Sequence, residues 1–240
     1  VLVVGVGAVL AAADTTLAVA VALVVIGVPA AAWAFGVLQP PGTARLAPGV
    51  PATVAVRGLL TWAFFASDAY VSLAIVDGRG AATWVAGLAL SAGAVCWTVG
   101  AWAQARAIDR LGPRRLVGTG MTIIAIGIAA MVASLAYLPL AVAIVAWGVA
   151  ASGMGLAYPT LSVTVLSLAA PGQEGGASSA LQLSDTLGQA IGTGVGGGII
   201  AIADAKGWSA MSGTSIVFVM ALVVALSGVL ASRRLPLRVE

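Results

Sequence analysis

The sequence predicts an all-α membrane protein, a polytopic bundle of transmembrane helices. Hydrophobic residues make up 61% of the 240 residues and charged residues only 8%, whereas a soluble domain carries about 25% charged residues. The mean hydropathy is +1.11, and the apolar residues gather in long runs separated by short polar breaks. A water-facing surface needs more charge than this, so most of the surface must face lipid.

Seven apolar runs have the length of a membrane-spanning helix, because ~20 mostly apolar residues cross the ~30 Å hydrocarbon core of a bilayer. The runs are residues 16–38, 57–76, 82–103, 116–138, 140–168, 177–203 and 210–231. A further run, residues 1–13, is too short alone, and we interpret it as the end of an eighth helix. The alternative is a signal peptide cleaved near residues 11–13, but the basic segment with which such peptides begin is absent from the sequence.

A Pro- and Gly-rich stretch over residues 39–56 divides the chain, since Pro and Gly oppose a continuing helix. Residues 1–38 form a predicted transmembrane hairpin that is truncated at its start. Residues 57–240 form a predicted unit of six helices. We therefore expect a hairpin, a cytoplasmic linker and a six-helix unit in that order.

Basic residues are distributed unevenly over the expected loops. If successive helices alternate in direction, only Arg79 and Lys206 fall on one side of the membrane. The other side holds Arg45, Arg57, Arg106, Arg110, Arg114, Arg115, Arg233, Arg234 and Arg238. Short cytoplasmic loops retain Lys and Arg, so we predict a multi-pass protein of the plasma membrane with a cytoplasmic C-terminus.

The composition excludes several classes of chemistry. The chain has no His and a single Cys, Cys96, which excludes an internal disulfide, a His/Cys metal cluster and a Ser-His-Asp or Cys-His catalytic group. An intramembrane enzyme would have to use an aspartyl pair such as Asp68 and Asp185, and neither lies in a recognisable catalytic motif. The basic residues lie in a few loops, which argues against a nucleic-acid surface. We therefore expect no enzyme, no metal, no cofactor and no nucleic-acid partner.

One charged stretch, residues 100–115, carries the pattern GAWAQARAIDRLGPRR. Asp109 follows an expected helix end and could pair with a neighbouring helix terminus, and Gly112 permits a tight turn into the next helix. Such a latch would hold one conformation and break when the bundle rocks. The alternative is an ordinary basic loop on the cytoplasmic side.

This stretch resembles the signature loop of the major facilitator superfamily, Gly-x3-Asp-Arg/Lys-x-Gly-Arg/Lys-x-Arg/Lys, which joins the second and third helices of a six-helix half. Here it joins the second and third helices expected after the linker. Ala105 replaces the family's Gly, and Pro113 departs from the pattern. The matching residues are Asp109, Arg110, Gly112, Arg114 and Arg115. The resemblance implies the C-terminal half of a major-facilitator-like transporter.

A second resemblance lies in the run 140–168. Gly148, Ser152, Gly155 and Pro159 follow the spacing i, i+4, i+7, i+11, so one helix face carries small side chains. This face resembles the Gly-rich, Pro-containing fourth helix of a facilitator C-terminal half. Small faces let membrane helices approach closely, so packing alone also explains the pattern.

The whole arrangement also resembles the fourteen-span drug:proton antiporters of this superfamily, in which an extra hairpin separates two six-helix halves. The hairpin over residues 1–38 fits that place. In a twelve-span member it would instead close the N-terminal half. Either resemblance implies that an N-terminal half of the same polypeptide is missing and is the partner of this chain.

Two carboxylates fall inside expected helices, and each costs at least ~2.5–3.5 kcal/mol at the bilayer centre unless it is hydrated, paired or protonated. Asp68 shares a helix face with Thr61 and Ser72, and Tyr70 adds a possible aromatic wall. We expect this face to line a translocation cavity, and Asp68 to take up and release protons. The alternative is that Asp68 lies near the outer water boundary and is merely hydrated.

Asp185 shares a stripe with Ser178, Gln182 and Gln189, which we expect to open to a cavity on the cytoplasmic side. The alternative is an interfacial helix start, where Asp185 would stabilise the N-terminal turn. Three glycines near the same face permit close helix contact, and these are Gly188, Gly192 and Gly196.

The leading hypothesis for function is a secondary active transporter that exports small amphiphilic or drug-like compounds, coupled to protons, by alternating access. Its partners would be the lipid bilayer, a small-molecule substrate and protons. The alternatives are an uptake carrier for a sugar or metabolite, and a non-transporting membrane receptor or scaffold.

Overall fold

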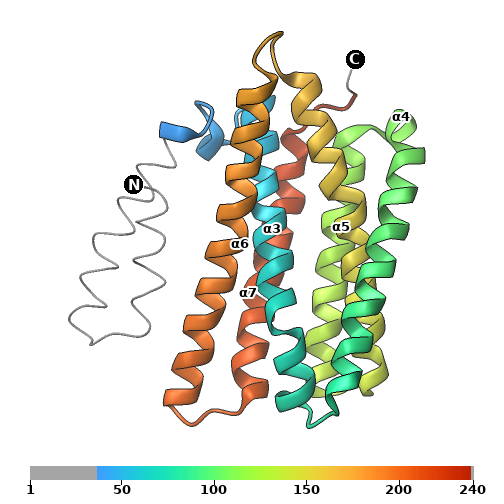
Figure 1. Ribbon diagram of the computed structural model, residues 1–240, viewed down its shortest axis with the longest axis vertical. Helices are drawn as coiled ribbons and strands as arrows, with labels where there is room; N and C mark the ends of the chain where they lie inside the picture. The colour runs from blue at the N-terminus through green and yellow to red at the C-terminus, as the bar shows by residue number, and fades with distance from the viewer. Residues whose placement is uncertain (1–36, 239–240) are drawn as a thin grey trace, which may run out of the picture.

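The computed structural model describes residues 37–238, where helices make up 86% of the residues and no β-strand occurs. The expected hairpin over residues 1–38 therefore lies outside the described residues, apart from its last two. Five of the helices are long and apolar enough to cross a membrane. The predicted class of an all-α, multi-pass helix bundle agrees with this architecture (Figure 1).

The described chain runs through two short 3-10 helices, one π-helical turn and five long helices. In chain order they are η2 (Thr43–Arg45), α3 (Val50–Leu73), the π turn η3 (Ala74–Gly78), α4 (Thr83–Ala136), α5 (Leu140–Leu168), α6 (Glu174–Ala205), α7 (Ala210–Ala231) and η4 (Ser232–Arg234).

Helix α4 is two helices joined at a sharp break. It has 54 residues, a length of about 81 Å at the rise of an α-helix, far more than a bilayer needs. Its backbone leaves helical geometry at Gly112, where φ is 72° and ψ is 168°. Only glycine adopts this positive φ without strain. The expected runs 82–103 and 116–138 therefore correspond to the segments before and after Gly112.

The two segments of α4 run in opposite directions beside α5. The neighbours of four glycines establish this. Along the first segment, the contacted residue of α5 has an increasing residue number, and along the second segment it has a decreasing one. The pairs are Gly93 with Trp147, Gly100 with Gly155, Gly120 with Ala157, and Gly127 with Ala146. Both segments therefore pack along the whole of α5 at short distance, as small residues allow.

Two expected boundaries were wrong, and each has a physical reason. Helix α3 begins at Val50, so the end of the expected linker 39–56 is helical, because Pro51 occupies the first turn, where its missing N–H costs nothing. The stretch 104–115, expected as a break between two helices, is helical on both sides of Gly112, since charged side chains at a membrane surface do not end a helix. Helices α5 and α7 have the predicted bounds.

The connections lie at two ends of the bundle (Figure 1). The start of α3, the break in α4, the α5–α6 connection and the end of α7 share one end, and the η3–α4 and α6–α7 connections share the other. The basic residues are distributed between these two ends as expected. Arg79 and Lys206 lie at the end that holds the η3–α4 and α6–α7 connections, and the other loop arginines lie at the opposite end. Arg57 is the exception, because it lies inside α3 and is buried.

Apolar side chains fill the interior of the bundle, and further large apolar side chains lie on its outer surface. Trp147, Phe218 and Met121 are among the largest fully buried side chains. Many large apolar side chains remain exposed on the outer faces of α4, α5 and α7, including Val95, Val145, Val163, Val223, Leu226 and Leu230. In water such a surface would be unfavourable, and it matches the lipid-facing surface expected of a membrane bundle.

Candidate functional site

A buried ion pair joins α3 to α6. Arg57 lies two turns into α3 and is 2% exposed. Its Nε donates to Oδ1 of Asp185 at 3.1 Å, which is the single salt bridge within residues 37–238. The sequence predicts a cytoplasmic flank for Arg57 and an open polar stripe for Asp185, and it does not predict the pairing of the two.

Tyr158 of α5 completes a triad with this pair. The Tyr158 hydroxyl donates to Oδ2 of Asp185 at 2.8 Å, so both carboxylate oxygens accept a hydrogen bond. Arg57 Nη1 donates to the backbone carbonyl of Tyr158 at 2.7 Å and to Oγ of Ser162 at 3.3 Å. The guanidinium Cζ also lies 3.1 Å from the centroid of the Tyr158 ring, a cation–π contact. The Arg57–Tyr158–Asp185 triad thus binds three helices together.

The triad lies inside the bundle and away from the helix ends. Arg57 is seven residues from the start of α3 and Asp185 eleven from the start of α6, which places them about 10 and 16 Å into the helices. A buried charge is tolerated at such depth only when it is paired and hydrogen-bonded. The alternative that Asp185 sits at an interfacial helix start therefore does not fit its surroundings.

Small and hydroxyl side chains bring α3 and α6 together beside the triad. Thr61 Oγ1 donates to the backbone carbonyl of Asp185 at 3.1 Å, and Ser184 Oγ donates to that of Val54 at 2.8 Å. A Cβ on Gly188 would overlap the Gly58 carbonyl oxygen and the Thr61 hydroxyl. Thr61 is fully buried, so it holds the two helices together and does not line an open cavity as predicted.

Gly192 and Gly196, the other two glycines predicted on this face, also lie against α3, further along α6. A Cβ on Gly192 would overlap Trp62, and one on Gly196 would overlap the ring of Tyr70. The Tyr70 hydroxyl donates to the backbone carbonyl of Thr193 at 2.7 Å. Tyr70 therefore packs between α3 and α6, and it does not form a wall beside Asp68.

Asp68 lies on the same face of α3 as Arg57. Arg57, Thr61, Asp68 and Ser72 follow the spacing i, i+4, i+11, i+15, which keeps them within one side of a helix. Asp68 and Ser72 are half-buried, and no hydrogen bond or ion pair joins Asp68 to another residue of 37–238. The rise from Arg57 to Asp68 is about 16 Å, so the two predicted carboxylates do not form one site.

The predicted polar stripe on α6 is divided by the structure. Asp185 is buried in the triad, whereas Ser178, Gln182 and Gln189 are exposed. The two glutamines therefore flank the ion pair on the outside of α6 and do not contact it.

Aromatic side chains extend from the triad toward Asp68. The Trp97 ring lies 5.8 Å from that of Tyr158 and 5.4 Å from that of Phe64, measured between centroids. Phe65 lies 5.4 Å from Phe64, and Trp147 stacks on Phe64 at 5.0 Å. Tyr158, Trp97 and Phe65 are half-exposed, so they form an aromatic surface over α3, α4 and α5.

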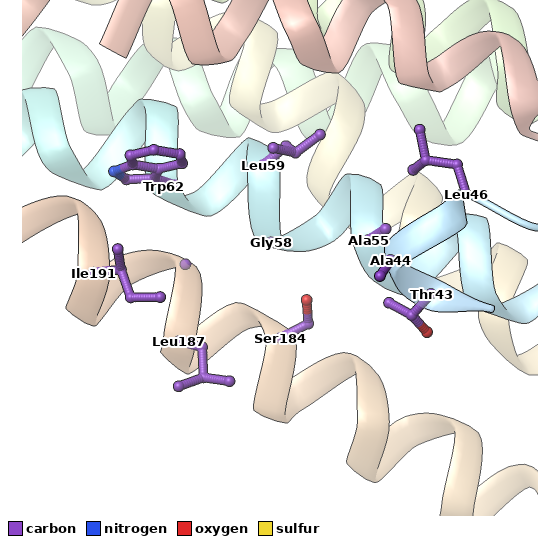
Figure 2. Close-up of a pocket in the computed structure, with 11 residues that line it drawn as sticks. Thr43, Ala44, Leu46, Ala55, Gly58, Leu59, Trp62, Ser184, Leu187 and Ile191 are labelled. Carbon is purple, nitrogen blue, oxygen red and sulfur yellow. The ribbon is translucent and has the colours of Figure 1, made fainter. Parts of the chain in front are cut away.

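A separate apolar pocket of about 350 Å³ lies where η2, α3 and α6 meet (Figure 2). Its polar side chains are Thr43, Ser184 and Trp62, and the Trp62 Nε1 is buried without a partner in the described part of the chain. The rest of the lining is Ala44, Leu46, Ala55, Gly58, Leu59, Leu187, Gly188 and Ile191. No carboxylate reaches this pocket, so it is distinct from the triad.

The small face of α5 packs on the first segment of α4. A Cβ on Gly155 would overlap the Trp97 carbonyl oxygen, one on Gly148 would lie 3.1 Å from Cys96 Sγ, and the Ser152 backbone borders Gly100. Pro159, next to Tyr158, is half-buried. The predicted small face thus brings α5 close enough to α4 for Tyr158 to reach Trp97.

The predicted signature loop contains the break at Gly112 but not the predicted latch. Asp109 is exposed and forms no ion pair with another residue of the described range. Arg114 instead donates from Nε to the Leu235 carbonyl at 2.9 Å. The contact to a neighbouring segment is therefore made by an arginine side chain and a backbone carbonyl, and not by the Asp109 carboxylate.

The fold and these polar groups define a class: a multi-pass membrane helix bundle with a buried ion pair in its interior. Within residues 37–238, no group of three or more Cys, Asp or Glu side chains lies close enough together to hold a metal ion. Comparisons with protein-family models and with curated proteins find no match to this chain.

Proposed function

We propose that this chain is the C-terminal part of a proton-coupled secondary transporter that exports small amphiphilic or drug-like compounds. The observation that carries the proposal is that only one of two carboxylates inside the bundle has a hydrogen-bonded partner. Asp185 is fully paired, whereas Asp68 is half-buried without a partner among the described residues. The resemblance of residues 100–115 to the major facilitator signature loop supports the same class.

The proton site in this proposal is Asp68. A carboxylate within a membrane helix needs a partner, water or a proton, and Arg57 already neutralises Asp185. Asp68 has the polar face of α3 around it and no cation within hydrogen-bond distance in the described range. Protonation and deprotonation of Asp68 would therefore change the net charge of this face of α3 during transport.

The substrate surface in this proposal is the aromatic surface of Phe65, Trp97 and Tyr158. Aromatic faces bind apolar groups and also attract cations. The carboxylate of Asp68 lies one turn beyond Phe65 on α3, so a cationic amphiphile can contact both. Release of the proton from Asp68 would then favour binding of the cation, and its uptake would favour release.

The triad acts as a clamp in this mechanism. It joins α3, α5 and α6 because Arg57 bonds to the Asp185 carboxylate and to the Tyr158 carbonyl, and the Tyr158 hydroxyl bonds to the same carboxylate. Alternating access by rocking of two helical units requires each unit to move as a body. The triad would keep these three helices in one body while that unit rocks against its partner unit.

The test is transport by the full-length protein in proteoliposomes with an imposed pH gradient and a cationic dye. The wild type should move the dye against its gradient. Asp68→Asn should abolish this uphill movement while retaining downhill exchange, and Ser72→Ala, one turn away on the same face, should behave as wild type. Unchanged uphill movement in Asp68→Asn would refute the proton site.

A further inference from the structure

The segment after α7, Leu235–Arg238, lies across the break in α4. Arg114 donates from its backbone N–H to the Pro236 carbonyl at 3.2 Å and from Nε to the Leu235 carbonyl at 2.9 Å. A Cβ on Gly112 would overlap the Leu237 carbonyl oxygen, and the Leu235 side chain is fully buried. The backbone of the segment is therefore bound to the break, and the Leu237 and Arg238 side chains remain exposed.

A pocket of about 220 Å³ lies between this segment and the break. Its lining consists of Arg110, Leu111, Arg115, Leu237 and Arg238. The three arginine side chains make no hydrogen bond or ion pair to another residue of 37–238. Asp109 is the acidic residue next to the pocket in sequence, and it is exposed and outside the lining. Three guanidinium groups around one pocket repel one another, so an anion there is favoured.

The surroundings of the pocket favour a lipid over a soluble anion. The pocket lies at an end of the membrane-length helices (Figure 1), which is the depth of phospholipid head groups. Guanidinium groups bind phosphate through paired N–H donors. Leu111 and Leu237 are 43% and 58% exposed beside the arginines, and they offer contact to the first carbons of acyl chains. A free phosphate would use the arginines alone.

We propose that this pocket binds the phosphate of an anionic phospholipid. Arg110 and Arg115 contribute from α4, and Arg238 contributes from the segment after α7. One bound head group then contacts both α4 and the segment after α7, and it strengthens the attachment of that segment to the break. This site does not depend on transport, and its failure would leave the proposed function unaffected.

The experiment measures lipid binding to the whole chain in detergent micelles by native mass spectrometry. Phosphatidylglycerol is compared with phosphatidylcholine of the same acyl chains. The double variant Arg110→Gln/Arg115→Gln is compared with Arg233→Gln/Arg234→Gln, which removes the same charge from exposed positions at the same end, outside the pocket. Arg238→Gln, in the exposed segment, provides a variant with little effect on folding, and thermal melting verifies that each protein is folded.

We expect tighter binding of phosphatidylglycerol than of phosphatidylcholine, and about a tenfold or greater loss in the pocket double variant. Arg238→Gln should lose about fivefold, and the control pair should lose less than about threefold. Equal losses in the two double variants would overturn the proposal in favour of diffuse surface attraction. Equal affinity for the two lipids, or full competition by millimolar inorganic phosphate, would also overturn it.

Discussion

Arg57 and Asp185, 128 residues apart in the chain, form a buried ion pair with 3.1 Å between Nε and Oδ1. Tyr158 of α5 accepts a hydrogen bond from Arg57 at its backbone carbonyl and donates one to Asp185 from its hydroxyl. Hydrogen bonds therefore link residues on three helices. Asp185, which the sequence predicts to face an open cavity, is thus part of the buried framework of the bundle. Asp68, the other carboxylate singled out in the sequence, has no ion-pair partner among residues 37–238.

Breaking the ion pair should destabilise the bundle. Asp185→Asn or Arg57→Gln leaves a buried, unpaired group and should cost about 3–5 kcal/mol of stability. The double variant Arg57→Met/Asp185→Leu should recover much of this loss, because well-packed apolar residues often replace buried ion pairs without cost. Thermal unfolding in micelles measures the series. The control is Asp68→Asn, which removes a carboxylate without a described partner and should melt close to wild type.

Tyr158→Phe should cost about 1.5–3 kcal/mol, because it removes a hydrogen bond to a charged acceptor while keeping the ring beside Arg57 and Trp97. In the Asp185→Asn background the same substitution should cost much less, since the acceptor is no longer an anion. The two effects form a double-mutant cycle. Additive losses would contradict the coupling between the hydroxyl and the carboxylate.

Two glycines of α6 should respond in opposite ways to alanine. Gly188→Ala places a methyl group against the Gly58 carbonyl oxygen and Thr61, so it should separate α3 from α6 and destabilise by about 1–3 kcal/mol, as overpacking does. Gly198→Ala meets no atom within 4 Å, and should stabilise the helix by about 0.5–1 kcal/mol. Unfolding midpoints of the two variants are compared directly. A stabilising Gly188→Ala would contradict the close α3–α6 contact.

Labelling of introduced cysteines tests the orientation in the membrane. In a Cys96→Ala background, Asp109→Cys and Leu237→Cys should react with a membrane-impermeant maleimide from the cytoplasmic side. Asp77→Cys and Lys206→Cys should react from the opposite side, since all four positions are exposed and Arg and Lys accumulate on the cytoplasmic side. Labelling of Asp109→Cys and Leu237→Cys from different sides would contradict the topology.

The bounds of two helices, α5 and α7, could be predicted from the sequence because the length and hydropathy that a bilayer requires are local properties of the chain. A helix must continue for ~20 apolar residues to cross lipid, and α5 and α7 begin and end where that pattern does. Gly112 was likewise visible as a turn residue, and its positive φ confirms the prediction. The close contact of Gly188, Gly192 and Gly196 with α3 agrees with their predicted spacing.

The triad could not be predicted in this way, although partial signals existed. Arg57 stands four residues before Thr61 on the predicted polar face, and Tyr158 precedes Pro159 on the small-faced helix. Local patterns explain Arg57 as a flanking charge, and they give Tyr158 no role. No local pattern relates Arg57 to a carboxylate more than a hundred residues later, because that contact depends on how α3, α5 and α6 pack.

The sequence by itself determined that this chain is helical, that its helices have membrane length and that its basic residues fall into two unequal sets. These properties depend on hydropathy, helix rise and loop charge, which are local. Only the tertiary structure decided which polar groups pair: Arg57 forms an ion pair with Asp185, and Arg114 donates a hydrogen bond to the backbone after α7. Pairing of charges in a low-dielectric interior depends on distances of a few ångströms between separate helices, and packing alone sets those distances.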